Sequence, residues 1–524
     1  MMKLLIAGLL CIGVIGAHAA PDATLVRQLA SDDSSVKVAA IQQLALTADP
    51  DALRVLKALS EDSLVVSGKQ VLIVDGDNAT DAITGAVAKR ADDAESITVN
   101  NRVRGELANA MAALKIFDRD RAVRLASAQR LQGKVGAEMA PLLGRALEKE
   151  SDGTIKSLLA LAHAQANLTN TDPTARLAAV RSLSESASPA IKSLLQPLAT
   201  TSEPDRRVRY AAISAVKDIE SRIARAESIG RIFSGLSLGS ILLLGALGLA
   251  ITYGVMGIIN MAHGELLMVG AYAGYGMQSL FRTYFPNAID WYLPAAIPLA
   301  FFAAAFVGVV MERTVIRWLY GRTLETLLAT WGLSLIMIQA ARVLFGAQNV
   351  EVANPSWMSG GVEILPNLLL PWNRIVIVGF AMFVLALVWG LMNKTRLGMF
   401  VRAVTQNRAM AGCVGVPTAR IDTLAFALGA GIAGLGGLAL SQISNVGPDM
   451  GQGYIVDAFM VVVLGGVGQL AGAVWAALGL GVFAKLLEGW AGAVIAKIVV
   501  LVFIIVFIQK RPQGLFALKG RFVE

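Results

Sequence analysis

A polar interruption in a long apolar run is the part of this sequence best suited to chemistry. Residues 235–275 are apolar and rich in glycine, but the stretch N-M-A-H-G-E at 260–265 places an amide, an imidazole and a carboxylate among them. A run of roughly 20 apolar residues can cross a bilayer, and polar groups within it must face protein or an aqueous path. We therefore predict that a small solute passes Asn260, His263, Gly264 and Glu265.

Other charged residues also stand in apolar segments, where their cost makes them candidates for function. Asp457 lies in a short, glycine-flanked segment, and we predict that it lines the same path. Glu325 and Arg342 lie in one apolar segment and are candidates for a structural ion pair.

The sequence offers no recognisable arrangement for covalent or metal chemistry. Its two cysteines, Cys11 and Cys413, stand in different segments, and His163 is alone in a helical stretch. These residues predict neither a disulfide, nor a zinc site, nor a nucleophilic triad. No G-x-x-x-x-G-K-[ST] loop is present, so the chain cannot energise transport by itself. We expect no enzyme activity, no cofactor and no metal.

Composition divides the chain into two unlike parts. The 524 residues are 55% hydrophobic and 16% charged, which is too apolar for one soluble domain. Residues 21–228 carry 27 basic and 27 acidic side chains, whereas 18 basic and 11 acidic side chains follow from residue 231. A basic membrane half is typical of cytoplasmic loops that face a lipid bilayer, and we expect no nucleic-acid partner.

The first residues have the pattern of a secretory signal peptide. Lys3 precedes an apolar stretch, and A-H-A at 17–19 is a small-residue cleavage site. An uncleaved anchor is the alternative. We predict a signal peptide over 1–19, a periplasmic helical-repeat domain over 20–229 and a membrane domain over 230–524.

A helical pattern recurs in the first half of the chain. An aspartate stands before apolar residues at three- and four-residue spacing at Asp33, Asp120, Asp172 and Asp205. Aspartate is favoured at helix N-caps, and a period near 33 residues indicates stacked helix pairs. The units resemble short HEAT-type repeats, with an irregular helical bundle as the alternative. Residues 69–78 predict a small strand pair with a turn, because β-branched residues alternate and D-G-D-N follows.

The membrane half threads the bilayer in about nine segments. If the repeat domain is outside, each basic cluster after Arg231 falls on the cytoplasmic side, as does the C-terminus. The predicted segments are 232–255, 266–280, 295–315, 324–344, 375–392, 422–440, 454–464, 471–487 and 494–508.

Four motifs of the second half resemble one family. They are N-x-A-H-G-[DE] at 260–265, the loop at 395–416, V-L-G-G-x-G-x-x-x-G-A from Val463, and R-P-x-G-L-F at 511–516. The family is that of the branched-chain amino acid and urea permeases of bacterial ABC importers. The resemblance implies an all-α, polytopic inner-membrane permease, here preceded by the repeat domain with its small β insertion.

This resemblance also implies roles and partners. A periplasmic solute-binding protein delivers a solute, a second related permease completes the pathway, and two cytoplasmic ATP-binding subunits drive transport. The ATPase coupling loop includes Arg396, Gly398, Arg402, Ala403, Asn407, Ala411 and Gly415, and the structural glycines are Gly465, Gly466, Gly468 and Gly472.

The long extension before the membrane half is what urea permease subunits of this family carry, so the resemblance makes urea the first expected solute. Branched-chain amino acids or short amides are the alternative. A passive solute channel and an anchoring protein that merely holds the repeat domain are rival interpretations from other classes.

Overall fold

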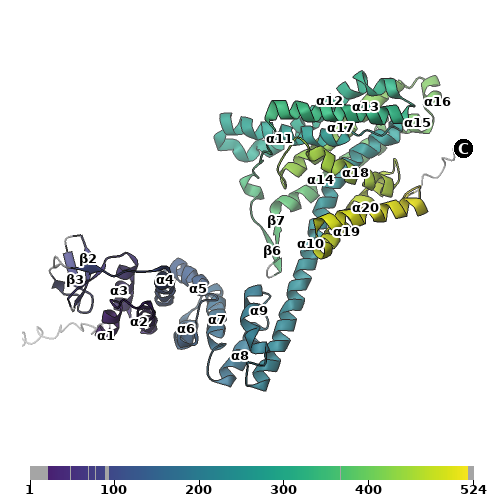
Figure 1. Ribbon diagram of the computed structural model, residues 1–524. Helices are drawn as coiled ribbons and strands as arrows, with labels where there is room; N and C mark the ends of the chain where they lie inside the picture. Colours follow the sequence, from purple (N-terminus) through teal and green to yellow (C-terminus); the bar gives the residue numbers. More distant parts are fainter. Residues whose placement is uncertain are drawn as a thin grey trace, which may run out of the picture. The chain divides into compact units, whose positions relative to one another are not determined.

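The computed structural model describes residues 22–47, 49–68, 70–76, 78–88, 94–365 and 368–516 (Figure 1). The predicted signal peptide over 1–19 lies outside these residues. The chain divides into two compact units after Ile223. This division point lies within one long helix, α10 (Arg206–Met256), as does the predicted domain boundary at residue 229.

Short helices make up most of the first unit. They are α1 (Ala23–Gln28), α2 (Ser34–Leu46), α3 (Pro50–Ser60), α4 (Asn101–Lys115), α5 (Arg121–Arg130), α6 (Ala140–Lys149), α7 (Gly153–Asn167), α8 (Pro173–Leu183) and α9 (Pro189–Leu195), followed by the first turns of α10.

The predicted aspartate caps are confirmed. Asp33, Asp120 and Asp172 are the N-cap residues of α2, α5 and α8. Each of these side chains, and that of Asp205 before α10, accepts a hydrogen bond from the amide two residues later at 2.7–2.9 Å. Each cap satisfies a backbone donor that the first helical turn leaves open.

Besides a small apolar cluster in the sheet, three larger apolar cores follow one another along the first unit and share helices. Leu107 and Ala110 of α4 belong to the first core, whereas Ala113 of the same helix belongs to the second. Helix α7 is shared in the same way, with Leu159 in the second core and Ala164 in the third. Cores linked only through neighbours are typical of stacked repeats; the HEAT-type assignment itself stays a prediction.

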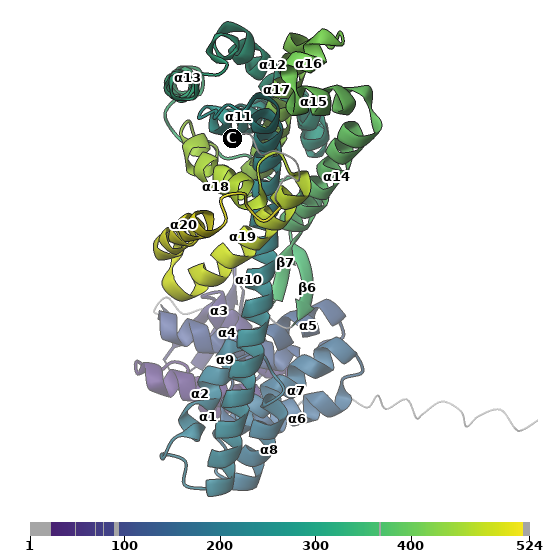
Figure 2. The ribbon, with the colours of Figure 1, turned by 90° about the vertical axis from the view of Figure 1, so that its right-hand side faces the viewer.

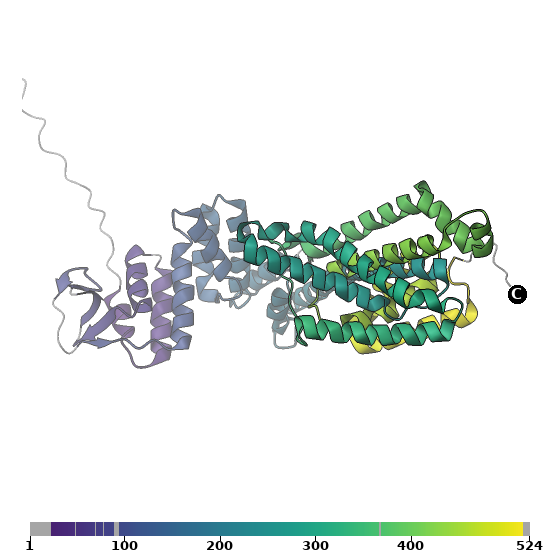
Figure 3. The ribbon, with the colours of Figure 1, turned by 90° about the horizontal axis from the view of Figure 1, so that it is seen from above.

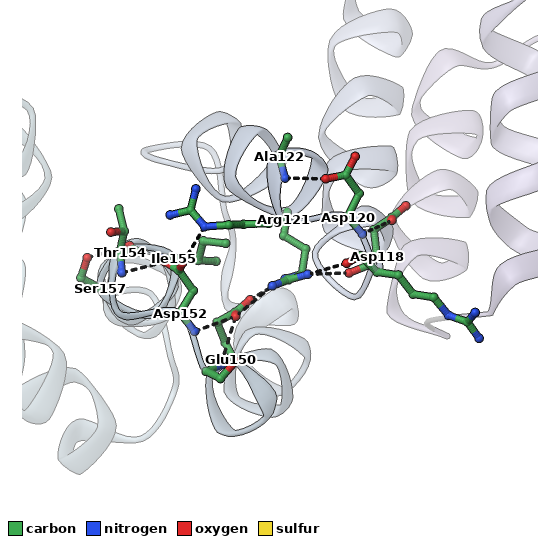
Figure 4. A network of polar contacts seen from close by, with 12 residues as sticks. Asp118, Asp120, Arg121, Ala122, Glu150, Asp152, Thr154, Ile155 and Ser157 are labelled. Atoms are coloured by element: carbon green, nitrogen blue, oxygen red, sulfur yellow. Dashed lines mark hydrogen bonds and ion pairs between the residues drawn. The ribbon is translucent and has the colours of Figure 1, made fainter.

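A repeated ion pair fixes the spacing between successive groups of helices within the first unit. Arg124, four residues after the cap Asp120, donates to both carboxylate oxygens of Glu150 at 2.8 and 3.3 Å. Arg176, four residues after the cap Asp172, donates to both carboxylate oxygens of Glu203 at 3.1 and 2.6 Å. Each arginine also bonds the carbonyl oxygens five and six residues before it. Figure 4 shows Glu150 beside the neighbouring Asp152 cap.

These contacts change how the carboxylates titrate. Burial alone would raise the pKa of Glu203, but hydrogen bonds from Arg176 and from the backbone amide of Asp205 hold that pKa below its usual value. The hydrogen bond from Arg124 is the main cause of the lowered pKa of Glu150. A carboxylate with a lowered folded pKa stabilises the fold above its unfolded pKa, roughly 4.3, and that contribution is lost as pH falls through the folded pKa.

The predicted strand pair is confirmed and belongs to a larger sheet. Strands β1 (Leu64–Ser67), β2 (Gln70–Asp75), β3 (Asn78–Asp81), β4 (Val87–Ala88) and β5 (Glu95–Ser96) form an antiparallel sheet in the order β4-β3-β2-β1-β5. The predicted turn joins β2 to β3, with Gly76 at φ +59°. The two short outer strands lack the alternating pattern on which the prediction rested.

The second unit is a bundle of long helices (Figure 2). After α10 come α11 (His263–Tyr284), α12 (Tyr292–Thr314), α13 (Thr323–Phe345), α14 (Trp372–Lys394), α15 (Arg396–Gln406), α16 (Arg408–Cys413), α17 (Thr418–Ser441), α18 (Met450–Gly465), α19 (Leu470–Ala491) and α20 (Ala493–Lys510). Helix α17 packs against both α11 and α12, and the view from above shows long helices running alongside one another (Figure 3).

Within the described residues, seven helices are long and apolar enough to cross a membrane: α10, α12, α13, α14, α17, α19 and α20. The other two predicted spans correspond to α11 and to the shorter apolar helix α18. A count of nine therefore stays a prediction. The connection between the predicted segments 324–344 and 375–392 contains a hairpin, β6 (Gly361–Leu365) and β7 (Leu368–Pro371), which the sequence did not predict.

We expect Arg176→Met to lower the local free energy of unfolding of α8–α10 by roughly 3 kcal/mol at pH 7, because Glu203 would stay buried without its partner. Side chains of the pair are only 10% and 3% exposed. Hydrogen exchange of the full chain measures the loss, which should shrink as pH falls through the lowered pKa of Glu203.

Arg121→Met is the matched control, since the Arg121 side chain is 59% exposed in its pair with Asp152. Exposed ion pairs contribute little to stability. Equal exchange in both variants would contradict a structural role for the buried pair.

Candidate functional site

The predicted polar break is a true interruption between two helices. Helix α10 ends at Met256, and Gly257 follows at φ +68°, a conformation that favours glycine. Its amide donates to the Tyr253 carbonyl at 2.9 Å, which closes the last turn. The chain regains helical structure only at His263, the first residue of α11.

Three polar side chains of the break are fully buried. The Asn260 Oδ1 atom accepts from the amide of Ala262 at 3.0 Å. The His263 Nε2 atom lies 3.0 Å from the Gly245 carbonyl oxygen on α10. Because a carbonyl can only accept, Nε2 carries the proton and Nδ1 is left as an acceptor. Glu265 stands in the first turn of α11, where the helix dipole favours a negative charge.

Helix α13 supplies two residues that the sequence analysis missed. Thr330 accepts a hydrogen bond from the amide of Met261 at 3.1 Å. Ser334, one turn further along, donates to Glu265 at 2.8 Å. Both are buried, and their spacing of four residues on one apolar helix was the available signal.

Each polar residue of the break keeps one buried atom without a hydrogen bond in the described structure. These atoms are Asn260 Nδ2, His263 Nδ1 and Glu265 Oε2. Such atoms are costly unless something else satisfies them. The break therefore combines one unused donor with two unused acceptors.

Asp457, the fifth predicted path residue, is placed differently. Its carboxylate lies 3.4 Å from Lys497 on α20, whereas the face of α18 that approaches α11 carries Gly451 and Ile455. The structure brings the four residues of the break together and gives Asp457 another partner. Glu325 pairs with Arg322 at 3.0 Å, and the possible pair with Arg342 is replaced by this contact.

Glycine lets the helices around the break approach through their backbones. A β-carbon on Gly264 would lie 2.4 Å from the Gly451 carbonyl oxygen of α18. One on Gly270 would lie 2.0 Å from the Gly434 carbonyl oxygen of α17. Real β-carbons do not come this close, so α11 can occupy its place only with glycine at these positions.

The predicted structural glycines join two motifs that are far apart in sequence. Gly465 and Gly472 pack backbone to backbone, so that a β-carbon on Gly472 would lie 1.9 Å from the Gly465 carbonyl oxygen. Gly466 and Gly468 turn the chain at φ +100° and +74°. The terminal R-P-x-G-L-F segment covers this turn, since the Leu515 amide donates to the Leu464 carbonyl at 2.8 Å.

The predicted coupling loop consists of α15 and α16 with a short connection to α17. Gly398 packs against the end of α14, where a β-carbon would lie 2.0 Å from the Met392 carbonyl oxygen. Arg402 donates to that same carbonyl. The other predicted residues are Arg396 at the start of α15, Ala403 within it, Asn407 at the N-cap of α16, buried Ala411, and Gly415 at φ +86°.

An ion pair at the base of this loop escaped the sequence analysis. Arg408, the first residue of α16, forms a two-pronged hydrogen bond with Asp422 of α17. Its guanidinium group also lies over the Tyr320 ring, 4.7 Å from the centroid. Asp422 stood at the edge of a predicted span, and nothing in the local sequence linked it to Arg408 across 14 residues.

A comparison with protein-family models matches residues 231–508, just over half of the chain, to the family described as branched-chain amino acid transport system / permease component. The chain belongs to this permease family. The match contains the helix break, the glycine turn and the predicted coupling loop. The protein is accordingly a multi-pass membrane protein, which agrees with its long apolar helices.

Individual permeases of the family match about half of the chain. The high-affinity branched-chain amino acid transport system permease protein LivH of Salmonella typhimurium is 29% identical over 294 residues, which are 54% of this chain and 94% of LivH. The corresponding protein BraD of Pseudomonas aeruginosa is 28% identical over 258 residues, 48% of this chain and 83% of BraD. No solved structure matches the chain significantly.

Gly270→Ala tests the close packing of α11 on α17. The added methyl group would overlap the backbone at Gly434, so we expect a loss of roughly 1–3 kcal/mol in the free energy of unfolding. All eight tryptophans follow residue 290, so thermal unfolding in detergent followed by tryptophan fluorescence reports on this unit.

Gly276→Ala is the control on the same helix, because nothing lies within 4 Å of its would-be β-carbon. Alanine there should be neutral or slightly stabilising. If both variants unfold at the temperature of the parent, the backbone contact does not constrain α11.

Proposed function

We propose that this chain is the membrane permease subunit of a binding-protein-dependent ABC importer. The observation that carries the proposal is the family match of the membrane unit, whose matched part holds both a buried polar break and a coupling loop. The first provides a path for a solute and the second a contact for an ATPase. The chain itself performs no chemistry.

The partners follow from this assignment. A periplasmic solute-binding protein delivers the solute, a second related permease completes the pathway, and two cytoplasmic ATP-binding subunits supply energy. Exposed apolar side chains on the coupling loop support an ATPase contact, since Met410 is 60% and Val414 74% exposed. The proposal has α15, α16 and the C-terminus in the cytoplasm and the repeat domain in the periplasm, an orientation that the basic loops support.

Urea is the solute that we favour. LivH is matched over 94% of its length by 54% of this chain, so nearly half of the chain has no counterpart in that amino acid permease. An extension of this kind was the feature that suggested a urea permease. The break also suits urea, because two unused acceptors and one unused donor complement its amide N–H groups and its carbonyl oxygen.

Branched-chain amino acids are the second candidate, and the names of the relatives favour them. Such a solute brings a carboxylate, which needs more than the one unused donor at Asn260. Within the described part of the break, no lysine or arginine contacts these polar groups. The break is a shared motif of the family, so the preference for urea over amino acids rests on the extension.

ATP-dependent uptake of labelled urea and of labelled leucine, measured side by side in cells with and without the chain, tests the function. We expect loss of the chain to abolish urea uptake alone. Asn260→Asp, which replaces the unused donor by an acceptor, should lower urea uptake roughly tenfold without lowering the amount of protein in the membrane.

Ser237→Ala is the control for that variant. The Ser237 hydroxyl is also buried without a partner in the described structure, but it lies within α10 and outside the break. This variant should transport normally. Loss of leucine uptake alone would replace urea by the second candidate, and uptake that persists without ATP would indicate a passive channel.

The repeat domain is proposed to dock a partner outside the membrane. Stacked helices offer an extended surface for binding, and the domain lies outside the residues that match the permease family. We expect a chain without residues 21–220 to insert in the membrane but to lose most uptake. Normal uptake and assembly of the shortened chain would refute a docking role.

A further inference from the structure

The contact between α16 and α17 has the features of a built junction. The Asp422 side chain is 0% exposed, whereas that of its partner Arg408 is 42% exposed. One nitrogen of the guanidinium group bonds Asp422 Oδ1 at 3.2 Å and another bonds Oδ2. The planar group lies over the Tyr320 ring, which comes from the connection between α12 and α13. One side chain of the loop thus contacts two other elements.

A buried carboxylate is costly unless it is paired and hydrogen-bonded. Asp422 therefore holds Arg408 in place, and with it the first turn of α16. The next residue of α17, Thr423, donates to a second buried carboxylate, Glu312, at 2.7 Å. The nearest cation to Glu312 is Arg317 at 3.9 Å, which is too long for a hydrogen bond. Among the described residues, Arg408 is the cation that bonds Asp422 directly.

Helix α17 continues from this junction to the polar break. Gly429 lies against the backbone of α10 at Gly248, and Gly437 against the backbone of α11 at Leu267, where a β-carbon would be 1.8 Å from the carbonyl oxygen. Contacts between backbones cannot relax by rotamer changes, so a displacement of α17 must move its neighbours. The Arg408–Asp422 ion pair and helix α17 therefore connect the loop to the helices that flank the break.

We propose that Arg408 is a positioning residue that ties the coupling loop to α17 and so transmits the motion of the ATPase to the solute path. This inference rests on the importer function proposed above. Arg402 and Gly398 anchor the other end of the loop on α14. Arg408 anchors the end of the loop next to α17 with an ion pair to its first turns, so its loss should weaken the coupling of loop motion to α17.

The test compares uptake with ATP hydrolysis in the complete importer, purified with its partner subunits and reconstituted in lipid vesicles. Arg408→Gln should leave ATP hydrolysis within about twofold of the parent and lower solute uptake roughly tenfold. A defect of folding or assembly lowers both rates together, whereas loss of transmission lowers uptake per ATP hydrolysed. Arg420→Gln is the control, because Arg420 is an exposed cation at the start of the same helix; its uptake per ATP should not change.

The double variant Arg408→Gln with Asp422→Asn removes both charges and leaves no unpaired buried carboxylate. It should fold. Its uptake per ATP should be as low as that of the single variant, because the single and the double variant both lack the ion pair between Arg408 and Asp422. Normal uptake per ATP in either variant overturns the inference, as does failure of the double variant to assemble. If the parent complex shows no ATP-dependent uptake of urea or leucine, the importer function fails instead.

Discussion

The close approach of helix backbones at glycine is the constraint on which the membrane unit depends. A polar break inside an apolar bundle is tolerable only if protein surrounds it and satisfies most of its groups. Contacts such as Gly264 on Gly451 and Gly270 on Gly434 bring α17 and α18 against α11 with no side chain between them. This proximity keeps Asn260, His263 and Glu265 buried. The density of glycine in these helices is thus a requirement for the site.

Helix α17 occupies a central position for the same reason. It contacts α11 and α12 along its length, and its first turns carry Asp422 and Thr423, which bond Arg408 and Glu312. The predicted coupling loop and the polar break are separated in sequence by more than 100 residues, yet α17 contacts the loop and both helices that flank the break. A second long-range closure joins the glycine turn after α18 to the terminal segment, through the bond between Leu515 and Leu464. Two motifs of the family are therefore parts of one structure.

The first unit is held together in a different way. Its helices are short, and each core is shared with the next through one helix. Buried pairs such as Arg176 with Glu203 fix the spacing of successive units, because a guanidinium fork accepts only one arrangement of the carboxylate. The equal numbers of acidic and basic residues in this half agree with such pairing. Stability here is a sum of neighbour contacts, whereas the membrane unit depends on long-range packing.

Local features were readable from the sequence. The aspartate caps, the strand pair near Asp75, the polar break and the short helices at 396–413 each depend on residues within a few positions of one another, so the local sequence reveals them. The coupling role of these helices stays a prediction. Partners across long distances were not readable: Thr330 and Ser334 beside the break, Arg408 with Asp422, and the terminal segment on the glycine turn. Asp457 shows the converse: an acid in a short apolar span predicted a place on the path, and the fold pairs it with Lys497; its place on the path stays a prediction. Residue type and spacing determine which segments are helical and which groups need partners; only packing decides which partner each group meets.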